Sequence, residues 1–159
     1  MNGPLGLTAF HHACIYACAH SCSDCWYDCT GCSKILEMLV EISTDFNIDL
    51  NAKDKGGRTA FHRASLHGRF DIGWILVQKS AEFNIDLDAK DKSGKTAFHL
   101  ACYWGFERFV EMMVTNADSF KIDLTAKDMD GKNGLQLAMA TERGRKSNVV
   151  NIIKERDHP

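Results

Sequence analysis

The clearest alternation of hydrophobic and polar residues lies directly before residue 88. Phe83, Ile85 and Leu87 alternate with polar residues, which predicts an extended segment with one buried side. The following stretch 91–94, Asp-Lys-Ser-Gly, has the composition of a turn. An extended segment followed by a turn predicts a hairpin loop.

Two short helices are predicted after this loop. Thr96 lies where a helix N-cap belongs, because its hydroxyl can accept a hydrogen bond from an unpaired amide of the first turn. Gly105 separates two groups of apolar residues, so the unit is predicted to be hairpin, helix, turn and helix. The two helices are predicted from apolar residues at helical spacing, which are Phe98, Leu100, Ala101 and Cys102, then Phe109, Val110, Met112, Met113 and Val114.

The loop segment recurs along the chain at a fixed period. Phe-Asn-Ile-Asp-Leu-Asn-Ala-Lys-Asp at 46–54 returns with small changes at 83–91 and at 120–128, each time after 37 residues. A constant period of this length is the signature of a stacked repeat protein, in which neighbouring units share their buried faces.

The helix start recurs at the same spacing. Thr-Ala-Phe-His-x-Ala begins at Thr59 and Thr96, and a degenerate copy begins at Asn133. A fourth copy begins at Thr8, which precedes Thr59 by one period plus 14 residues. Four units are therefore expected, the first of them interrupted by an insertion.

This pattern resembles the ankyrin repeat, whose usual motif Thr-Pro-Leu-His-x-Ala is similar to the Thr-Ala-Phe-His-x-Ala found here. The resemblance covers nearly the whole chain. It implies an all-α repeat solenoid of about four helix-turn-helix units with short β-hairpin loops, forming a single domain over 1–159. The repeats are expected at approximately 1–44, 45–81, 82–118 and 119–156.

The period exceeds the family's usual length of about 33 residues, and the added residues fall between the second helix and the hairpin. The family normally has glycine at this helix end, where this chain has Asn47, Asn84 or Lys121. Asparagine can adopt the left-handed conformation that a helix C-terminus often needs. The local geometry is therefore expected to be preserved.

The two ends of the array look unfinished. The chain begins only seven residues before Thr8, so the first unit lacks its hairpin. The last unit ends with an apolar helix, containing Val149, Val150, Ile152 and Ile153, that nothing further is expected to cover. Terminal repeats usually have a polar outer face, so the chain is expected to be one section of a longer ankyrin protein.

The resemblance also implies a binding surface, because the hairpin tips and the concave face of the first helices usually contact partners in this family. Basic tips beside aromatic residues, with Trp104 expected to be exposed, have the composition of an interface for a protein partner that is acidic at its rim. Alternatively, the lysines are only solvated loop tips, partly neutralised by nearby aspartates. The partner-binding positions carried over are Tyr16, Lys53, Lys55, Arg58, Leu66, His67, Lys90, Lys92, Ser93, Lys95, Tyr103, Trp104, Lys127, Met129, Asp130, Lys132, Ala140 and Thr141.

Catalysis is not expected from this sequence. His11, His62 and His99 occupy the motif position at which the family uses the imidazole as a structural hydrogen-bonding bridge beside the capping threonine. No Ser, His and Asp set lies outside the repeat framework, and no glycine-rich phosphate loop follows a strand. We therefore expect a non-enzymatic scaffold or adaptor without a cofactor, or, alternatively, a structural spacer.

Composition and charge narrow the partners further. Hydrophobic residues make up 45% and charged residues 25%, as in soluble globular proteins, and the net charge is -2. This balance argues against nucleic-acid binding. The apolar stretch 5–19 is interrupted by polar residues and is too short to span a bilayer. An intracellular, cytoplasmic protein is expected, since crowded cysteines in odd number suit a reducing compartment.

The insertion 17–30 concentrates cysteines at steps of three and four residues, which is helical spacing, so it could lengthen the first helix and perhaps the second. Alignment of the second helices places Gly31 opposite Gly68 and Gly105, so the insertion is expected to end at the normal turn. The six cysteines in and around it are Cys14, Cys18, Cys22, Cys25, Cys29 and Cys32.

Three interpretations of these thiols compete. Cys22-x-x-Cys25 followed by Cys29-x-x-Cys32 has the paired soft ligands of a structural zinc site. A straight helix would spread these sulfurs over about 15 Å, whereas zinc bonds to sulfur are about 2.3 Å long. Zinc therefore requires the insertion to bend. The alternatives are small apolar residues on a protruding loop or helical finger, and a segment without functional constraint.

One modification site is also suggested by the resemblance. Asn51 matches the hairpin asparagine that asparaginyl hydroxylases modify in many ankyrin proteins, and its equivalents are Asp88 and Thr125. An unmodified structural asparagine is the alternative.

Overall fold

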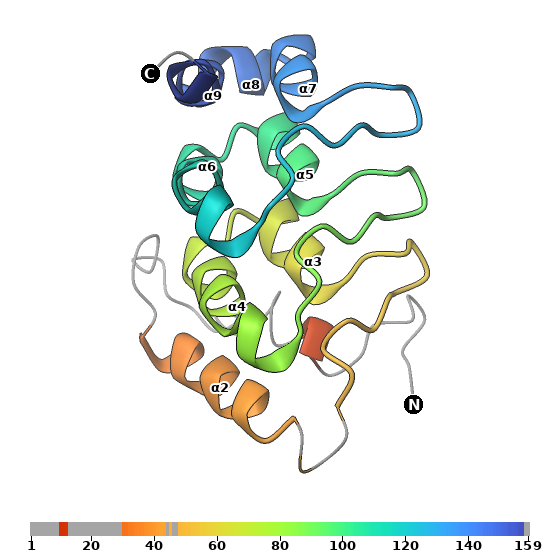
Figure 1. The fold of residues 1–159 in the computed structure, drawn as a ribbon, viewed down its shortest axis with the longest axis vertical. Coiled ribbons are helices and arrows are strands. Elements are labelled where there is room, and N and C mark those ends of the chain that lie inside the picture. Colours follow the sequence, from red (N-terminus) through yellow and green to blue (C-terminus); the bar gives the residue numbers. More distant parts are fainter. Residues whose placement is uncertain (1–9, 13–29, 44, 46–47, 158–159) are drawn as a thin grey trace.

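The computed structural model describes residues 10–12, 30–43, 45 and 48–157, and the described residues form a stack of helix pairs with hairpin loops along one edge (Figure 1). No β-strand occurs among them. The predicted all-helical repeat solenoid is confirmed. Its helices are α2 (Thr30–Glu41), α3 (Ala60–Leu66), α4 (Phe70–Phe83), α5 (Ala97–Trp104), α6 (Glu107–Phe120), α7 (Gly134–Ala140), α8 (Glu142–Lys146) and α9 (Val149–Asp157).

The helices lie in two columns. The first helices of successive repeats, α3, α5 and α7, pack on one another next to the loops, and α2, α4, α6 and α9 form the outer column (Figure 1). Phe61, Phe98 and Phe109 are almost completely buried in the core that the helices share. Burying one such side chain stabilises a fold by roughly 1.5–3 kcal/mol, so neighbouring repeats stabilise one another through a shared core.

Each hairpin loop is closed by two backbone bonds instead of a strand pair, one of which runs from the amide of Gly94 to the carbonyl of Asp91 (2.9 Å) in the third repeat. The amide of Asp91 donates to the carbonyl of Lys95 (2.9 Å), and Asp54 and Asp128 repeat this bond with Arg58 and Lys132. The first helix then begins as predicted, since Thr96 is the N-cap of α5. The loops are therefore tight turns that lead directly into the inner column.

The ends of α4 and α6 confirm the conformation expected at the longer connections. Asn84 and Lys121 are left-handed, with φ of 51° and 55°. The amide of the next residue bonds five residues back in both cases, from Ile85 to Ser80 and from Ile122 to Ala117. Asn47 lies outside the described residues.

The extended segment is shorter than the alternation suggested. Ile85 and Leu87 are buried as predicted, but Phe83 is the last residue of α4 and is not extended. The final turn of a helix can direct one apolar side chain inward, and two-residue periodicity does not distinguish that case from a strand.

The turn predicted at Gly31 is wrong. Gly31 lies inside α2, which begins at Thr30, three residues before the position that aligns with the start of α6. Gly68 and Gly105 have positive φ and do form turns. Aligning the repeats cannot detect this difference. The alignment compares motif positions, whereas α2 begins about one helical turn before its motif position.

The second helix of the fourth repeat is divided into α8 and α9. Ser147 lies between them, and the Asn148 amide is held by the Glu107 carboxylate at 2.8 Å. Val149 and Ile153 are buried and pack in the shared core, and Val150 and Ile152 are half-buried against it. Across the described segments, no helix is both long and apolar enough to cross a membrane.

Replacing Lys121 with glycine should stabilise the protein, because glycine adopts a left-handed conformation without the steric cost that a Cβ imposes. We expect the free energy of unfolding from urea titration to rise by about 0.5–1 kcal/mol. Asn84→Gly is the matched control and should gain less, since asparagine tolerates this conformation. An unchanged or lower stability for Lys121→Gly would contradict the assignment of strain.

Candidate partner-binding surface

A buried aspartate organises each hairpin loop. One carboxylate oxygen of Asp91, Oδ1, accepts hydrogen bonds from the amides of Ser93 (2.8 Å) and Lys95 (3.0 Å). Asp54 and Asp128 bind the amides two and four residues later in the same way, at distances between 2.7 and 3.0 Å. The loop backbone is therefore fixed by a side chain within the loop.

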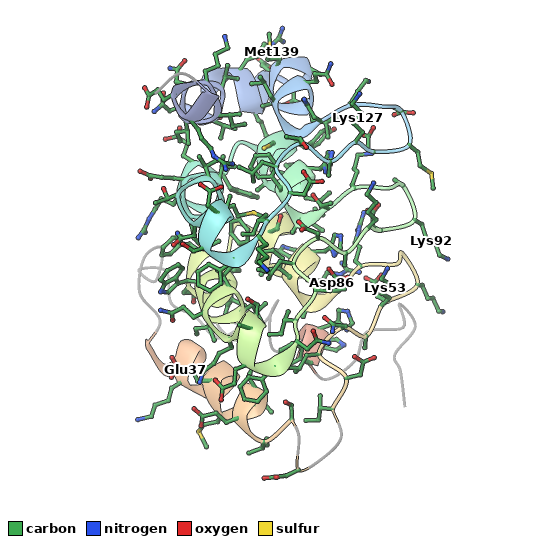
Figure 2. The ribbon with its side chains drawn as sticks, viewed as in Figure 1. Glu37, Lys53, Asp86, Lys92, Lys127 and Met139 are labelled. Atoms are coloured by element: carbon green, nitrogen blue, oxygen red, sulfur yellow. The ribbon has the colours of Figure 1, made fainter. Side chains whose placement is uncertain are left out.

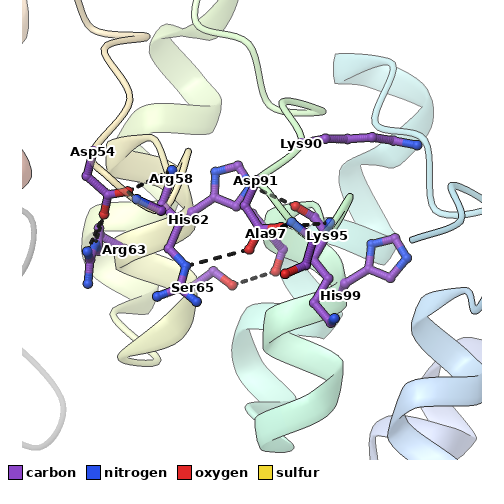
Figure 3. Close-up of polar contacts among 12 residues, drawn as sticks. Asp54, Arg58, His62, Arg63, Ser65, Lys90, Asp91, Lys95, Ala97 and His99 are labelled. Carbon is purple, nitrogen blue, oxygen red and sulfur yellow. Dashed lines mark hydrogen bonds and ion pairs between the residues drawn. The ribbon is translucent and has the colours of Figure 1, made fainter. Parts of the chain in front are cut away.

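The second oxygen of each aspartate faces a cation. Arg58 lies 3.6 Å from Asp91, and Lys95 lies 3.6 Å from Asp128, so each pair joins consecutive loops. Asp54 instead pairs with Arg63 on α3 (Figure 3). Arg58 and Lys95 therefore have a role within the stack, and partner contact by them stays a prediction.

The charge states of these aspartates follow from their surroundings. Burial acts to raise the pKa of Asp54, but hydrogen bonds from the Arg58 amide and the Arg63 guanidinium hold it below its ordinary value. Burial likewise opposes a lowered pKa at Asp128, where the Lys132 amide and the Lys95 charge prevail. Both carboxylates are thus ionised at neutral pH, as their cationic partners require.

Two lysines at the loop tips form a ladder along the stack. The ammonium of Lys53 donates to the carbonyl of Lys90 (3.0 Å), and that of Lys90 donates to the carbonyl of Lys127 (2.9 Å). Figure 2 shows Lys53, Lys92 and Lys127 along the edge formed by the loops. Lys53 and Lys90 remain exposed, so they both tie the loops together and contribute positive charge.

The loop of the fourth repeat has the most exposed apolar tip. Met129 is 76% exposed and occupies the position that Lys55 and Lys92 hold in the preceding loops. The neighbouring Lys127 and Lys132 are exposed as well. An exposed apolar side chain flanked by two cations resembles the apolar centre and polar rim of a protein–protein interface.

The C-terminal end of α5 carries the aromatic patch, which we define as Tyr103, Trp104 and Arg143. Tyr103 is 42% exposed and meets Trp104 edge to face, with ring centroids 5.5 Å apart. Trp104 was expected to be exposed, but it is half-buried, and the Arg143 guanidinium lies 4.7 Å from its ring centroid. Such cation–π contacts stabilise by roughly 0.5–1 kcal/mol at exposed sites.

Arg143 was not predicted, because it follows the concave positions Ala140 and Thr141 in the irregular helix α8, outside the repeat motif. Thr141 supports the patch by donating its hydroxyl to the carbonyl of Tyr103 (3.0 Å). Ala140 is exposed.

The other predicted concave residues are divided between exposed and half-buried positions. Leu66 is half-buried and His67 is exposed at the end of α3. Partial burial and the positive charges of Arg63 and Arg69 lower the pKa of His67. Tyr16 lies outside the described residues.

The histidines of the repeat motif have the structural role that was expected. The Nδ1 atom of His62 accepts from the Thr59 amide (3.2 Å), and its Nε2 donates to the carbonyl of Lys95 in the next loop (3.0 Å). His99 makes the same contacts with Thr96 and Lys132. Burial lowers the pKa of both imidazoles, which keeps Nδ1 as an acceptor.

Asn51 also joins consecutive repeats. Its amide nitrogen donates to the carbonyl of Asn84 (2.8 Å), and its oxygen accepts from the amide of Asp86 (2.8 Å). These bonds fit the structural alternative, and hydroxylation of Asn51 stays a prediction. At the equivalent Asp88, burial and the charges of Asp123 and Asp86 raise the carboxyl pKa.

The zinc hypothesis remains a prediction. Cys22, Cys25 and Cys29 lie outside the described residues, and for Cys32 only the backbone, within α2, is described. In the described segments, no three histidine, cysteine, aspartate or glutamate side chains gather as a metal site would require. Burial raises the pKa of Cys102, the cysteine of α5, so its thiol stays protonated.

The histidine bridges predict an acid-sensitive stack. A pKa lowered on folding contributes stability above the ordinary value of 6.5, and this stability is lost as the pH falls through the folded pKa. Protonated Nδ1 becomes a donor and can no longer accept from the threonine amide. We expect the free energy of unfolding, from urea titrations at pH 7.5, 6.5 and 5.5, to decrease below pH 6.5.

His99→Gln tests the source of this decrease. Gln136 already replaces histidine in the fourth repeat, and its side-chain oxygen accepts from the Asn133 amide at 3.0 Å. Glutamine at 99 should therefore keep the local bond and lose the bond to Lys132, at a cost of about 1 kcal/mol at pH 7.5. The variant should also lose less stability on acidification. Equal losses in variant and wild type would refute this role of His99.

Comparison with known proteins agrees with this architecture. The family model "Ankyrin repeats (many copies)" matches residues 42–101, and the model "Ankyrin repeat" matches residues 93–128, so together they cover more than half of the chain. The search of curated proteins found no matching relative. Ankyrin repeats generally mediate protein–protein interaction and are typically non-enzymatic. The chain belongs to the ankyrin-repeat family.

Proposed function

We propose that this protein is an interaction scaffold that binds a protein partner through the loop tips and the aromatic patch of α5. The observation that carries the proposal is the exposure of Tyr103 (42%) and Met129 (76%) on otherwise well-packed elements. Residues 97–102, which precede Tyr103 in α5, are all buried. Large apolar side chains on a fixed backbone lose little freedom when a partner covers them.

The charges around these residues favour an acidic partner. Lys92, Lys127 and Lys132 are exposed on the loops, and Arg143 is exposed beside Trp104. The loops 52–58, 89–95 and 126–132 hold eight lysines and arginines but only four aspartates, although acidic residues outnumber basic ones in the whole chain. Charge separated in this way speeds association with a partner of opposite sign and disfavours other partners.

Binding a partner through this surface depends on the positions and charges of its side chains and needs no catalytic group. The loop aspartates and motif histidines, which could suggest catalysis in isolation, are occupied by bonds within the stack. Their contribution is to hold the surface in one shape. An intracellular location is part of the proposal, since an odd number of cysteines, most of them crowded between Cys14 and Cys32, suits a reducing compartment better than a disulfide scaffold.

The double variant Tyr103→Ala, Met129→Ala tests the surface. Proteins captured from a cell extract by wild type and variant would be quantified by mass spectrometry. Loss of a contact that contributes about 2 kcal/mol lowers affinity roughly 30-fold. We therefore expect at least one protein to be retained by wild type and almost absent from the variant.

Met38→Ala provides the matched control, because Met38 is 57% exposed on α2, outside the proposed surface. It should capture the same proteins as wild type, and thermal unfolding should show that all three proteins are folded. If the Met38 variant lost the same proteins, or the double variant retained all of them, the proposed surface would be wrong.

A further inference from the structure

A shallow groove of about 350 Å³ runs between α4 and α6, two outer helices that lie on the side of the stack away from the hairpin loops (Figure 1). One row of its lining comes from α4 and the other from α6, and residues three or four apart on a helix lie on the same face. The lining includes Phe70 and Trp74 from α4, and Arg108, Glu111, Met112 and Thr115 from α6.

The first turn of the groove already holds a cation against an aromatic ring. The Arg108 guanidinium lies 4.6 Å from the centroid of the Phe70 ring. A guanidinium is attracted to the face of an aromatic ring, and its flat shape lets it stack there. This contact shows which kind of group the two helix faces accept between them.

The next turn of the groove offers a second such place without a cation of its own. Trp74 follows Phe70 by one turn and is half-buried, and Glu111 follows Arg108 by one turn and is exposed. Met112 is 5% exposed and supplies an apolar surface beside them. In the part of the chain that the structure describes, no cation lies over the Trp74 ring and none pairs with Glu111.

The charge of these two helices favours a basic ligand. α4 and α6 together contain five acidic residues and two basic ones. One of the basic residues, Lys79, pairs with Glu82 and Glu41, and the other, Arg108, stacks on Phe70. The outer helices therefore present the opposite charge to the loops and attract partners of the opposite kind.

We propose that this outer groove, defined as Phe70, Trp74, Arg108, Glu111 and Met112, binds an arginine side chain from a basic segment of a protein partner. The guanidinium stacks on Trp74 and pairs with the Glu111 carboxylate, and its apolar stem lies on Met112. Arginine fits better than lysine, because its planar group can stack on a ring and bond a carboxylate through two N–H groups.

The outer groove is separate from the surface of the proposed function. That surface consists of the loop tips and the aromatic patch, and its partner is acidic. The outer groove lies on other helices and binds a basic segment, so the two sites can be tested independently.

Titration with the peptide acetyl-Ala-Leu-Arg-Leu-Ala-amide tests the proposal. The chain has three tryptophans, whose indole N–H signals can be followed by NMR and assigned through Trp74→Phe and Trp104→Phe. We expect the Trp74 signal to move, with a Kd on the order of 1 mM for this single contact, and the Trp104 signal to stay. The same peptide with citrulline in place of arginine has the shape but not the charge, and should leave the Trp74 signal in place.

Two variants separate the carboxylate from the ring. Glu111→Gln removes a charge from an exposed position and should weaken binding about threefold. Trp74→Leu keeps an apolar side chain in the groove but removes the ring, and should weaken binding about threefold or more when it is followed through the Met112 amide signal. Glu155→Gln, at an exposed glutamate on α9, is the matched control and should leave the Kd unchanged. Thermal unfolding would check that each variant is folded.

Three outcomes would overturn the proposal. The Trp74 signal could stay in place up to about 10 mM peptide, ten times the expected Kd. Glu155→Gln could weaken binding as much as Glu111→Gln, which would show general attraction to an acidic protein. The peptide could also move the Trp104 signal alone, which would place it at the aromatic patch. None of these results would decide the proposed function, whose test uses Tyr103 and Met129.

Discussion

The buried aspartate in each hairpin loop satisfies two sets of partners at once, and the rest of the stack depends on this arrangement. One carboxylate oxygen of Asp91 holds two amides of its own loop, and the other faces Arg58 of the preceding loop. A buried carboxylate without such partners would cost several kcal/mol. The same side chain therefore fixes the shape of a loop and its distance from the neighbouring loop.

This arrangement explains why the cations of the loops are not equivalent. Arg58 and Lys95 balance buried aspartates, and Lys53 and Lys90 bond to carbonyls of the next loop. Lys127 and Lys132 hold the same positions in the last described loop, where both are exposed. The proposed contacts of the loops with other proteins consequently concentrate in the third and fourth repeats.

Sequence could predict what one repeat specifies by itself. The period of 37 residues, the threonine caps and the histidine bridges follow from a motif whose bonds are local or point to the next copy. The left-handed Asn84 follows from the preference of asparagine for that conformation.

The features that sequence could not predict depend on irregular parts of the array. Gly31 is helical because α2 begins earlier than the second helices of the regular repeats. Alignment with those repeats therefore places a turn at Gly31. Arg143 lies over the Trp104 ring from α8, a short helix outside the repeat motif. Met139 is 49% exposed, whereas Cys102, which holds the same motif position in α5, is buried. This difference depends on which residues pack over each helix and not on the motif.

The most direct measurement of the central claim compares Asp91→Ala with Asp86→Ala in urea unfolding. Asp86 is an exposed aspartate of the same repeat that accepts one loop amide, from Asp88 at 3.1 Å. Removing the Asp91 carboxylate should lower the free energy of unfolding by about 3 kcal/mol, because two amides and a cation lose their partner. Asp86→Ala should cost about 0.5 kcal/mol. Equal costs for the two substitutions would contradict the claim that the buried aspartate holds the stack together.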